Sequence, residues 1–548
     1  MTDRPDEHLF ASGTGASWTG GAAGEGGGGG ERPWRAARSF GGVTFISGLG
    51  AAVGLVSNGL IAYHFGVGRL TDAFFLAQSI PLVLAHLLQS GPLPSVFLPI
   101  FVRVRREVSA EAAWRLLNSL LNFILLLCAV LAALGFVLAP WIVRVVGAGF
   151  DEATWAASVR MLRFLIFTIL SHTLSGVLII SLNALNLFVL PAALSLLPTL
   201  GVVLCVGILA PSLGLDAWIL GNLAGPAAFL TALGLVLWRQ GYRYRPVLDF
   251  RAPDLRETLR RVSQFFISSA FTQGQTLSTR FVASLLAPGS LSALAYAERL
   301  FLAASALFTI PLPNVVFPEL VRMKVGDRLD DLKALVFKTS RALVLLLLPI
   351  GIGMMAVSGL AVGTLLQRGA FDPEAAFRTS WALVLYFIAF VPLGYKMLFT
   401  NTHHALGKTR VVVIGLCAAQ GTIIAGNFLF TRMFGYVGVP IAHVLGQFVL
   451  VGVHVHFLRA SFPLKGFFWN SSNRRSLAAA VLMGAAALLL QWLWPAGPET
   501  SGLWKGGVLI GVIGGSALVY TGLILGFGVP EVKDLTARVR ARFKRGAL

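Results

Sequence analysis

Three basic residues stand deep inside long apolar segments, where a charge is costly and therefore marks a candidate functional site: Arg280, Arg299 and Lys396. The alternative is a structural ion pair, or a side chain that extends back to the membrane interface. Glu298 directly precedes Arg299, so on a helix it points about 100° away and could pair with Arg280 or Lys396. The sequence contains no GxxxxGK[ST] nucleotide-binding loop, nucleophile–base pair or metal-ligand cluster. We therefore expect a binding site without a metal or cofactor, and no covalent catalysis.

The composition explains why those charges are unusual. The chain has 548 residues, of which 56% are hydrophobic and 12% are charged, and its mean hydropathy is +0.77. A soluble domain has about a quarter of its residues charged, because water must solvate its surface. This composition excludes soluble enzymes and secreted disulfide scaffolds and predicts a membrane protein. The net charge of +20 fits basic membrane loops better than nucleic-acid binding.

Fourteen apolar stretches are long enough to cross a hydrocarbon core of about 30 Å as helices. They lie near residues 41–65, 71–101, 116–143, 161–182, 187–209, 216–238, 263–287, 291–320, 340–366, 380–401, 410–431, 437–458, 476–494 and 504–527. The predicted fold is an all-α polytopic membrane protein with about 14 transmembrane helices. The second and eighth stretches contain internal prolines, so we expect them to be kinked or broken.

The basic residues alternate between the two ends of these stretches. The termini and the loops after even-numbered stretches carry 33 of the 44 Lys and Arg residues, and the other loops and their margins carry eight. Because cytoplasmic loops are enriched in Lys and Arg, both termini are predicted to be cytoplasmic and the number of helices to be even.

Two similar sequences indicate an internal repeat. PLPSVFLPIFVR (92–103) and PLPNVVFPELVR (311–322) share seven of twelve residues at an offset of 219, and a basic loop follows each. Six helices separate equivalent points, which predicts two six-helix halves related by a parallel pseudo-two-fold axis, plus two further C-terminal helices. Transporters that alternate access often have such a plan, with the substrate cavity between the halves.

The prolines of this repeat, among them Pro92, Pro94, Pro311 and Pro313, remove backbone donors at matching places. A helix must bend or open there. We expect a gating bend at these positions, and the alternative is a static kink.

Four further motifs carry a family resemblance. They are FGVGRLTDAFFLA (65–77), ASLLAPGSLSALAYAERL (283–300), LLQRGAFDPEA (365–375) and HHALGKTRVVV (403–413). In this order, over about residues 40–460, they resemble the MurJ (MviN) lipid II flippase family of the multidrug/oligosaccharidyl-lipid/polysaccharide exporter superfamily.

The resemblance implies a membrane transporter and not an enzyme. It would move an undecaprenyl-pyrophosphate-linked glycan, foremost the peptidoglycan precursor lipid II, across the bacterial cytoplasmic membrane by alternating access. The expected divisions are a disordered cytoplasmic tail (1–38), an N-lobe of helices 1–6 (39–240), a C-lobe of helices 7–12 (241–460), helices 13–14 with a lipid-tail groove (461–530), and a basic cytoplasmic tail (531–548). Energy would come from the membrane potential or a monovalent cation, and the expected oligomeric state is a monomer.

Family residues credited with function carry over onto Asp72, Ser292 and Arg299. A guanidinium pairs with phosphate through two hydrogen bonds and a lysine adds a point charge, so Arg299 and Lys396 are the predicted pyrophosphate ligands. Asp72 is a predicted gating residue, with a helix N-cap as the alternative. Ser292 has the same alternative.

The sequence also departs from the family pattern. The family's two arginines and aspartate in the first helix, and its basic pair in the second, align with Ala51, Ser57, Asn58, Ala85 and His86. One turn after Arg299, where the family has an acidic residue, this sequence has Leu302. Neutral groups suited to sugar hydroxyls would line the first lobe instead, namely Asn58, Gln78, His86 and Gln89.

These departures leave three other functions open. The chain could flip an exopolysaccharide precursor or another lipid-linked oligosaccharide. It could also be an ion-coupled multidrug exporter, although its first-lobe helices are nearly free of acids, or a scaffold that has lost transport. The pair His403–His404 is expected to be polar surface at a cytoplasmic helix end.

Overall fold

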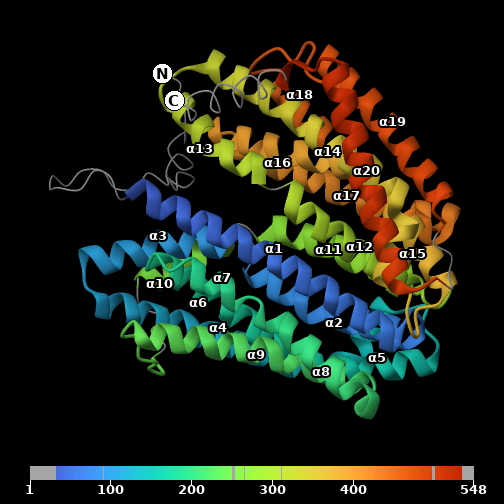
Figure 1. The fold of residues 1–548 in the computed structure, drawn as a ribbon. Coiled ribbons are helices and arrows are strands. Elements are labelled where there is room, and N and C mark those ends of the chain that lie inside the picture. The colour runs from blue at the N-terminus through green and yellow to red at the C-terminus, as the bar shows by residue number, and fades with distance from the viewer. Residues whose placement is uncertain are drawn as a thin grey trace.

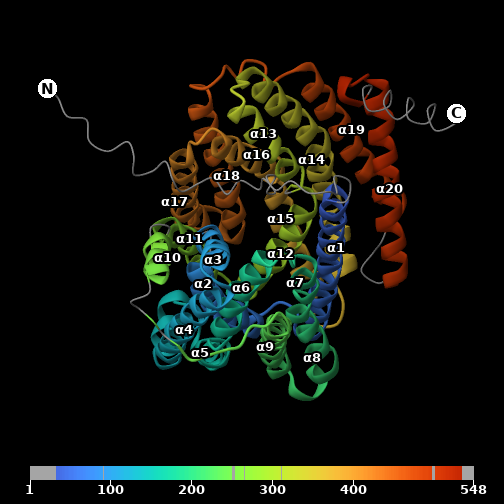
Figure 2. The same ribbon diagram turned by 90° about the vertical axis from the view of Figure 1, so that its left-hand side faces the viewer.

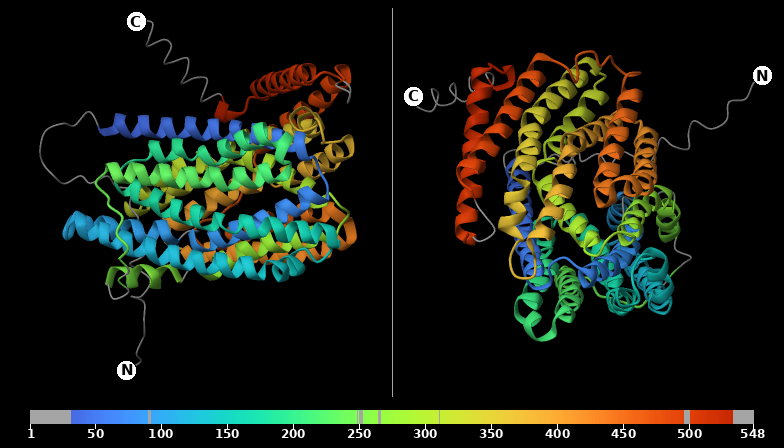
Figure 3. Two further views of the ribbon diagram at one scale, coloured as in Figure 1. Left: turned by 90° about the horizontal axis from the view of Figure 1, so that it is seen from below. Right: turned by 90° about the vertical axis from the view of Figure 1, so that its right-hand side faces the viewer.

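The computed structural model describes residues 32–89, 92–247, 249, 253–263, 266–309, 311–495 and 500–532, and the elements within these ranges are helices. Most run side by side along one axis (Figures 1 and 3). The first half contains α1 (Arg32–Phe65), α2 (Arg69–Gln89), α3 (Pro92–Glu107), α4 (Ala110–Val146), α5 (Glu152–Leu165), α6 (Thr168–Ala184), α7 (Val189–Leu194), α8 (Leu197–Leu213), α9 (Leu215–Arg239) and α10 (Pro253–Ser263). The second half contains α11 (Phe266–Ser284), α12 (Ser290–Phe308), α13 (Pro311–Val325), α14 (Leu329–Leu365), α15 (Pro373–Ile388), α16 (Phe390–Ala405), α17 (Thr409–Phe434), η1 (Gly435–Val437), α18 (Gly438–Leu458), α19 (Ser471–Leu493) and α20 (Gly502–Gly526).

Twelve spans among the described residues are long and apolar enough to cross a membrane. The all-helical, polytopic fold is therefore confirmed, while the number fourteen stays a prediction. Two features account for the difference. α11 is rich in Ser, Thr and Gln and is not among the twelve, and residues 409–458 count as a single span. That span contains two helices packed on each other, since α17 ends at Phe434 and is followed by Gly435, whose φ of +62° suits glycine.

The two proline-rich segments are each divided into two helices, as predicted. The second predicted segment consists of α2 and α3, and the eighth consists of α12 and α13. Pro92 and Pro311 are the first residues of the second helix in each pair, where a missing N–H has no cost.

The loops after α1, α4, α11 and α14 meet at one end of the molecule, which we call the latch end. The amide of Ala370 donates to the carbonyl of Tyr63 at 2.8 Å, and a Cβ placed on Gly149 would lie 2.3 Å from the carbonyl oxygen of Ser284. These loops follow odd-numbered predicted segments, so the basic loops of the even-numbered segments lie at the opposite end.

The helices form two groups that meet at the latch end. α1 to α9 pack among themselves in the lower half of Figure 2, and α12 to α18 form the upper half, with α19 and α20 against α14 at the periphery (Figure 3). The groups touch where α2 packs on α11 and α12, where α1 packs on α12, and where α4 packs on α11.

Two predicted boundaries differ from the structure. The first helix begins at Arg32, inside the predicted tail of residues 1–38 and not at 41, because the alanines and arginines of RPWRAARSF favour a helix. The predicted C-lobe begins at 241, yet α10 packs on α3 and α4 of the first group. Arg103 holds it there through Asp254 at 2.8 Å and Glu257 at 3.2 Å. The remainder of the N-terminal tail and residues 533–548 lie outside the described residues.

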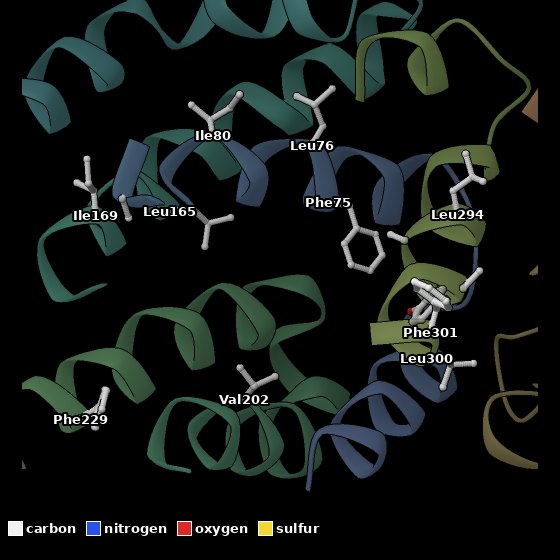
Figure 4. Packing of buried hydrophobic residues seen from close by; sticks show 14 of the residues in the cluster. Phe75, Leu76, Ile80, Leu165, Ile169, Val202, Phe229, Leu294, Leu300 and Phe301 are labelled. Atoms are coloured by element: carbon white, nitrogen blue, oxygen red, sulfur yellow. The ribbon is translucent and has the colours of Figure 1, made fainter. Parts of the chain in front are cut away.

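Aromatic packing fixes α2 between the two groups. Trp218 of α9 stacks on Phe74, with ring centroids 3.5 Å apart, and meets Phe75 edge-on. Phe75 in turn meets Tyr296 of α12 edge-on at 5.4 Å. Figure 4 shows Phe75 pointing from α2 toward α12, which carries Phe301. This packing orients both helices that carry the candidate site.

Candidate functional site

Arg299 of α12 extends from the second group of helices into the first. Its Nη1 donates to Oδ1 of Asn58 in α1, and its Nη2 donates to Oε1 of Gln78 in α2, both at 3.0 Å. The guanidinium carbon also lies 4.7 Å from the ring centroid of Phe75, a cation–π distance. No carboxylate within the described ranges bonds to Arg299. The structure thus places this cation between the two groups, held by neutral amides.

Gln78 continues the polar contacts into the first group. Its Nε2 donates to Oδ1 of Asn222 in α9 at 2.6 Å, and Asn222 donates to the carbonyl of Trp218 at 2.9 Å. Asn222 was not predicted from the sequence, because an asparagine in an apolar segment has no local pattern that distinguishes a structural role from a functional one.

Arg280 and Glu298 form the ion pair that was one of the two predicted alternatives. Nη2 of Arg280 lies 3.3 Å from Oε2 of Glu298, and the side chains are 13% and 37% exposed. Nε and Nη1 of Arg280 are buried and have no hydrogen-bond partner within the described part of the chain. Arg280 therefore has two unused donors beside the Arg299 site.

Lys396 of α16 is half-buried and forms no hydrogen bond or ion pair with the residues that the structure describes. Electrostatic interactions connect it to His443 and His454 of α18, and connect His443 to Glu298. His443 also packs edge-on against Tyr386, with ring centroids 5.5 Å apart. Neither Tyr386 nor His443 was predicted as a site residue, because only the tertiary packing brings α15 and α18 to the Arg280–Glu298 pair.

Asp72 joins the two groups at the latch end. Its side chain is 3% exposed and accepts hydrogen bonds from the amides of Gly289, at 2.6 Å, and Ser292, at 2.7 Å. These amides begin α12, so Asp72 of α2 caps a helix in the other group and not its own helix. The helix dipole of α12 favours this negative charge.

Ser292 and Gly289 complete this contact. The Ser292 hydroxyl donates to the carbonyl of Gly289 at 3.2 Å, within the first turn of α12. Gly289 has a φ of +87°, and a Cβ there would lie 2.8 Å from Cγ1 of Val67, so another residue would be strained. We call Asp72, Gly289 and Ser292 the latch.

The predicted neutral lining of the first lobe is divided between two places. Asn58 and Gln78 contact Arg299, as described above. His86 is exposed near the end of α2, and an electrostatic interaction connects it to His172 of α6. Gln89 lies against α6, since a Cβ on Gly176 would be 2.9 Å from its Cδ.

The proline positions lie apart from these contacts. Pro313 is buried, and its carbonyl accepts a hydrogen bond from Asn401 of α16 at 3.1 Å. Pro311 begins α13, and Pro92 and Pro94 are backbone positions in the first turn of α3. The gating bend stays a prediction.

The expectation that His403–His404 is polar surface is wrong for His403, which is fully buried. Its ring stacks on His454 of α18, with centroids 5.0 Å apart, and its Nε2 lies 3.3 Å from the His454 carbonyl. The helix end was correctly placed, but α18 covers this face of α16.

An apolar groove runs beside the second group. It has a volume of about 820 Å³ and is lined by α14, α15 and α19, with Met355, Trp381 and Leu488 among its residues. Of the two C-terminal helices, α19 contributes lining residues to the groove and α20 does not.

Solved structures share this fold. "Lipid II flippase MurJ, inward closed conformation" superposes with a TM-score of 0.75 at 21% identity, over 90% of this chain and 99% of that one. An inward-facing multidrug resistance MATE family transporter of the MOP superfamily superposes with a TM-score of 0.60 at 13% identity, over 79% and 96%. This chain therefore shares the helical fold of both proteins.

Sequence comparison identifies the family. Its "Lipid II flippase MurJ" model matches residues 61–501, so the chain belongs to the MurJ family of lipid II flippases, which are membrane transporters and not enzymes. The Lipid II flippase MurJ of Burkholderia cenocepacia is 26% identical, over 77% of this chain and 81% of that protein. The probable lipid II flippase MurJ of Vibrio cholerae is 23% identical over 89% and 95%, and that of Thermotoga maritima is 26% identical over 82% and 89%.

Proposed function

We propose that this chain moves the peptidoglycan precursor lipid II from the inner to the outer leaflet of the bacterial cytoplasmic membrane, with Arg299 binding the pyrophosphate. Both termini are cytoplasmic in this proposal, because the basic loops lie opposite the latch end. The latch end then faces outward. The observation that carries the proposal is the place of Arg299, a cation between the two lobes whose hydrogen-bond partners among the described residues are neutral amides.

Those amides make Arg299 available to a phosphate. A carboxylate partner would have to be displaced at the cost of an ion pair, whereas Asn58 and Gln78 offer neutral acceptors. A phosphate adds the attraction of opposite charges and bidentate geometry to the hydrogen bonds of the guanidinium. Pyrophosphate can therefore replace both amides and free them for the sugar hydroxyls of the glycan.

The surrounding charges favour a dianion. Arg280, Arg299 and Lys396 carry three positive charges in the second lobe, and Glu298 carries one negative charge. Nε and Nη1 of Arg280, which have no partner among the described residues, can also donate to phosphate oxygens. Because outward movement of the dianionic pyrophosphate carries negative charge away from the negative inner side, the membrane potential is the proposed energy source.

The latch supplies the second requirement of alternating access, which is a closed outer side. Asp72 holds the start of α12 while the lobes are joined at that end. Separation of the lobes there would break both of its hydrogen bonds and would also separate Arg299 from Asn58 and Gln78. The affinity for the pyrophosphate and the opening of the outer side are thus coupled through α12.

The test is transport of fluorescent lipid II in proteoliposomes. Arg299→Ala should abolish transport, and Arg299→Lys should retain a small part, since lysine keeps the charge without the bidentate geometry. Arg474→Ala is the matched control, because Arg474 is an exposed arginine on α19. Normal transport by Arg299→Ala in folded, inserted protein would refute the assignment.

A further inference from the structure

A polar pocket lies at the latch end, away from the Arg299 site between the lobes. It has a volume of about 340 Å³ and lies between the ends of α14 and α19 and the start of α20. Its lining includes Gln367, Gln491, Trp494 and Lys505. Such a volume accommodates a phosphate headgroup.

The pocket is positively charged. Lys505 lines it with a side chain that is 6% exposed, in the first turn of α20, where a positive charge opposes the helix dipole. Arg368 follows Gln367 of the lining and lies against the first residue of α20, since a Cβ on Gly502 would be 3.1 Å from its Nη2. The first turn of α20 contains no acidic residue. Two cations and a helix N-terminus thus converge where an anion would be stabilised.

The polar pocket is continuous with the apolar groove described above. Gly359 of α14 lines both, and α14 and α19 form walls of both. The groove has a volume of about 820 Å³ and includes Phe377, Trp381 and Leu488, which are exposed. A molecule that fills both spaces needs an anionic head directly attached to an alkyl chain.

Exposed tryptophans place this end at the membrane surface. Trp492 and Trp494 at the end of α19 and Trp504 at the start of α20 are 77%, 50% and 52% exposed. Tryptophan is enriched at the level of lipid headgroups. The pocket therefore lies at the depth of the phosphates of the adjoining leaflet, and the groove lies at the depth of its acyl chains.

We propose that this pocket and groove bind one anionic membrane phospholipid, with its phosphate at Lys505 and Arg368 and an acyl chain between α14, α15 and α19. The charges select an anionic headgroup over a zwitterionic one. The groove requires the attached chain, so a free phosphate or glycerol phosphate is insufficient.

The same loop connects the lipid site to the closed outer side. Gln367 lines the pocket, Arg368 lies against α20, and the amide of Ala370 donates to the carbonyl of Tyr63 in the first lobe. A lipid that orders this loop also orders the contact between the lobes. Bound anionic lipid should therefore stabilise the arrangement in which the latch end is closed.

Native mass spectrometry of the full chain in detergent tests the proposal, with phosphatidylglycerol and phosphatidylcholine of equal chain length. One molecule of phosphatidylglycerol should bind in preference to phosphatidylcholine. The double variant Lys505→Gln with Arg368→Gln should lower the affinity for phosphatidylglycerol by about tenfold or more, as expected for lost charge-assisted contacts. Lys465→Gln with Arg474→Gln, two exposed cations at the opposite end, is the matched control. Ala485→Phe, which fills the groove and keeps the charges, should also weaken binding.

The other outcomes contradict the proposal. Equal binding of both phospholipids, or unchanged binding by both sets of variants, would overturn it. Preference for undecaprenyl phosphate over phosphatidylglycerol would assign the site to the carrier lipid, and binding of glycerol 1-phosphate alone would remove the role of the groove. Because the measurement is binding and not transport, it is independent of the role proposed for Arg299.

Discussion

The two lobes differ in how they present polar groups to their shared centre. The second lobe contributes the cations Arg280, Arg299 and Lys396, while the first contributes the neutral amides Asn58 and Gln78. Charge alone would bind pyrophosphate equally well whether or not the lobes are joined. Because the partners of Arg299 are on the opposite lobe, its availability depends on the lobes' relative position. The asymmetry thus provides a means to couple binding to conformation.

Moving the charge between the lobes is the most severe test of this comparison. Arg299→Asn should reduce transport about 100-fold or more, as expected when a charge-assisted phosphate contact is lost. Asn58→Arg combined with Arg299→Asn would restore the same residue types with the charge in the first lobe. We expect the double variant to regain binding of lipid II but not transport. Restored transport in proteoliposomes would show that the lobe carrying the charge is unimportant.

Loss of the latch should have the next largest effect. Asp72→Ala removes two hydrogen bonds to the start of α12, each worth about 1.5–3 kcal/mol with a charged acceptor. Cysteines introduced at Tyr63 and Ala370, whose backbones bond to each other across the lobes at 2.8 Å, should then crosslink less, because the lobes separate at this end. Asp72→Asn keeps one acceptor and should give an intermediate yield. An unchanged crosslinking yield in Asp72→Ala would contradict the latch.

The Arg280–Glu298 pair tests whether the charge of the second lobe is balanced. Glu298→Gln removes the lobe's carboxylate at the site and leaves Arg280 unpaired, so lipid II should bind several-fold more tightly and leave more slowly. The expected signature is a lower KM for lipid II with a lower maximal rate. Arg280→Gln, which removes the cation, should raise KM instead. A change in the same direction in both variants would argue against an electrostatic role.

The smallest effect concerns a carboxylate at the latch end and outside the membrane-spanning helices. The pKa of Asp151 is lowered, first by its hydrogen bond with Thr154 and then by Arg69. A lowered pKa contributes stability that is present above the ordinary value of about 3.9 and is lost as pH falls through the folded-state value. Thermal unfolding of the wild type and Asp151→Asn should therefore differ by a constant amount from pH 8 to pH 5. The difference should shrink below pH 4, and a difference that grows on acidification would contradict this assignment.

The sequence was sufficient for the broad architecture because that architecture depends on solvent. Lipid requires long apolar helices with internally bonded backbones, and the segments at 71–101 and 291–320 had to break at their prolines. The distribution of Lys and Arg likewise sorted the loops into two sets, and the loops after α1, α4, α11 and α14 do meet at one end. The start of α1 was missed because its first residues, RPWRAARSF, include arginines, whereas the predicted segments were apolar stretches.

The sequence also identified Arg299 and Glu298, since a charge in an apolar helix is visible without a structure. It did not identify their partners. Glu298 had two possible cations, and packing of α11 on α12 selected Arg280. His403 was assigned to the surface because its own helix end looked polar, yet α18 buries it. Asn222 and His443 were missed because an isolated polar residue acquires its role only from neighbours distant in the chain.

The amino-acid sequence by itself determined that this protein spans a membrane, which loops share a side, and which few charges have no reason to be in lipid. Those properties follow from the free energy of transferring each segment from water to lipid, which depends on the residues of that segment alone. Only the tertiary structure decided that Asp72 caps the helix of the opposite lobe and that Arg299 rests on amides across the interface. Hydrogen bonds depend on distances of about 3 Å, and the packing of helices more than 200 residues apart sets those distances.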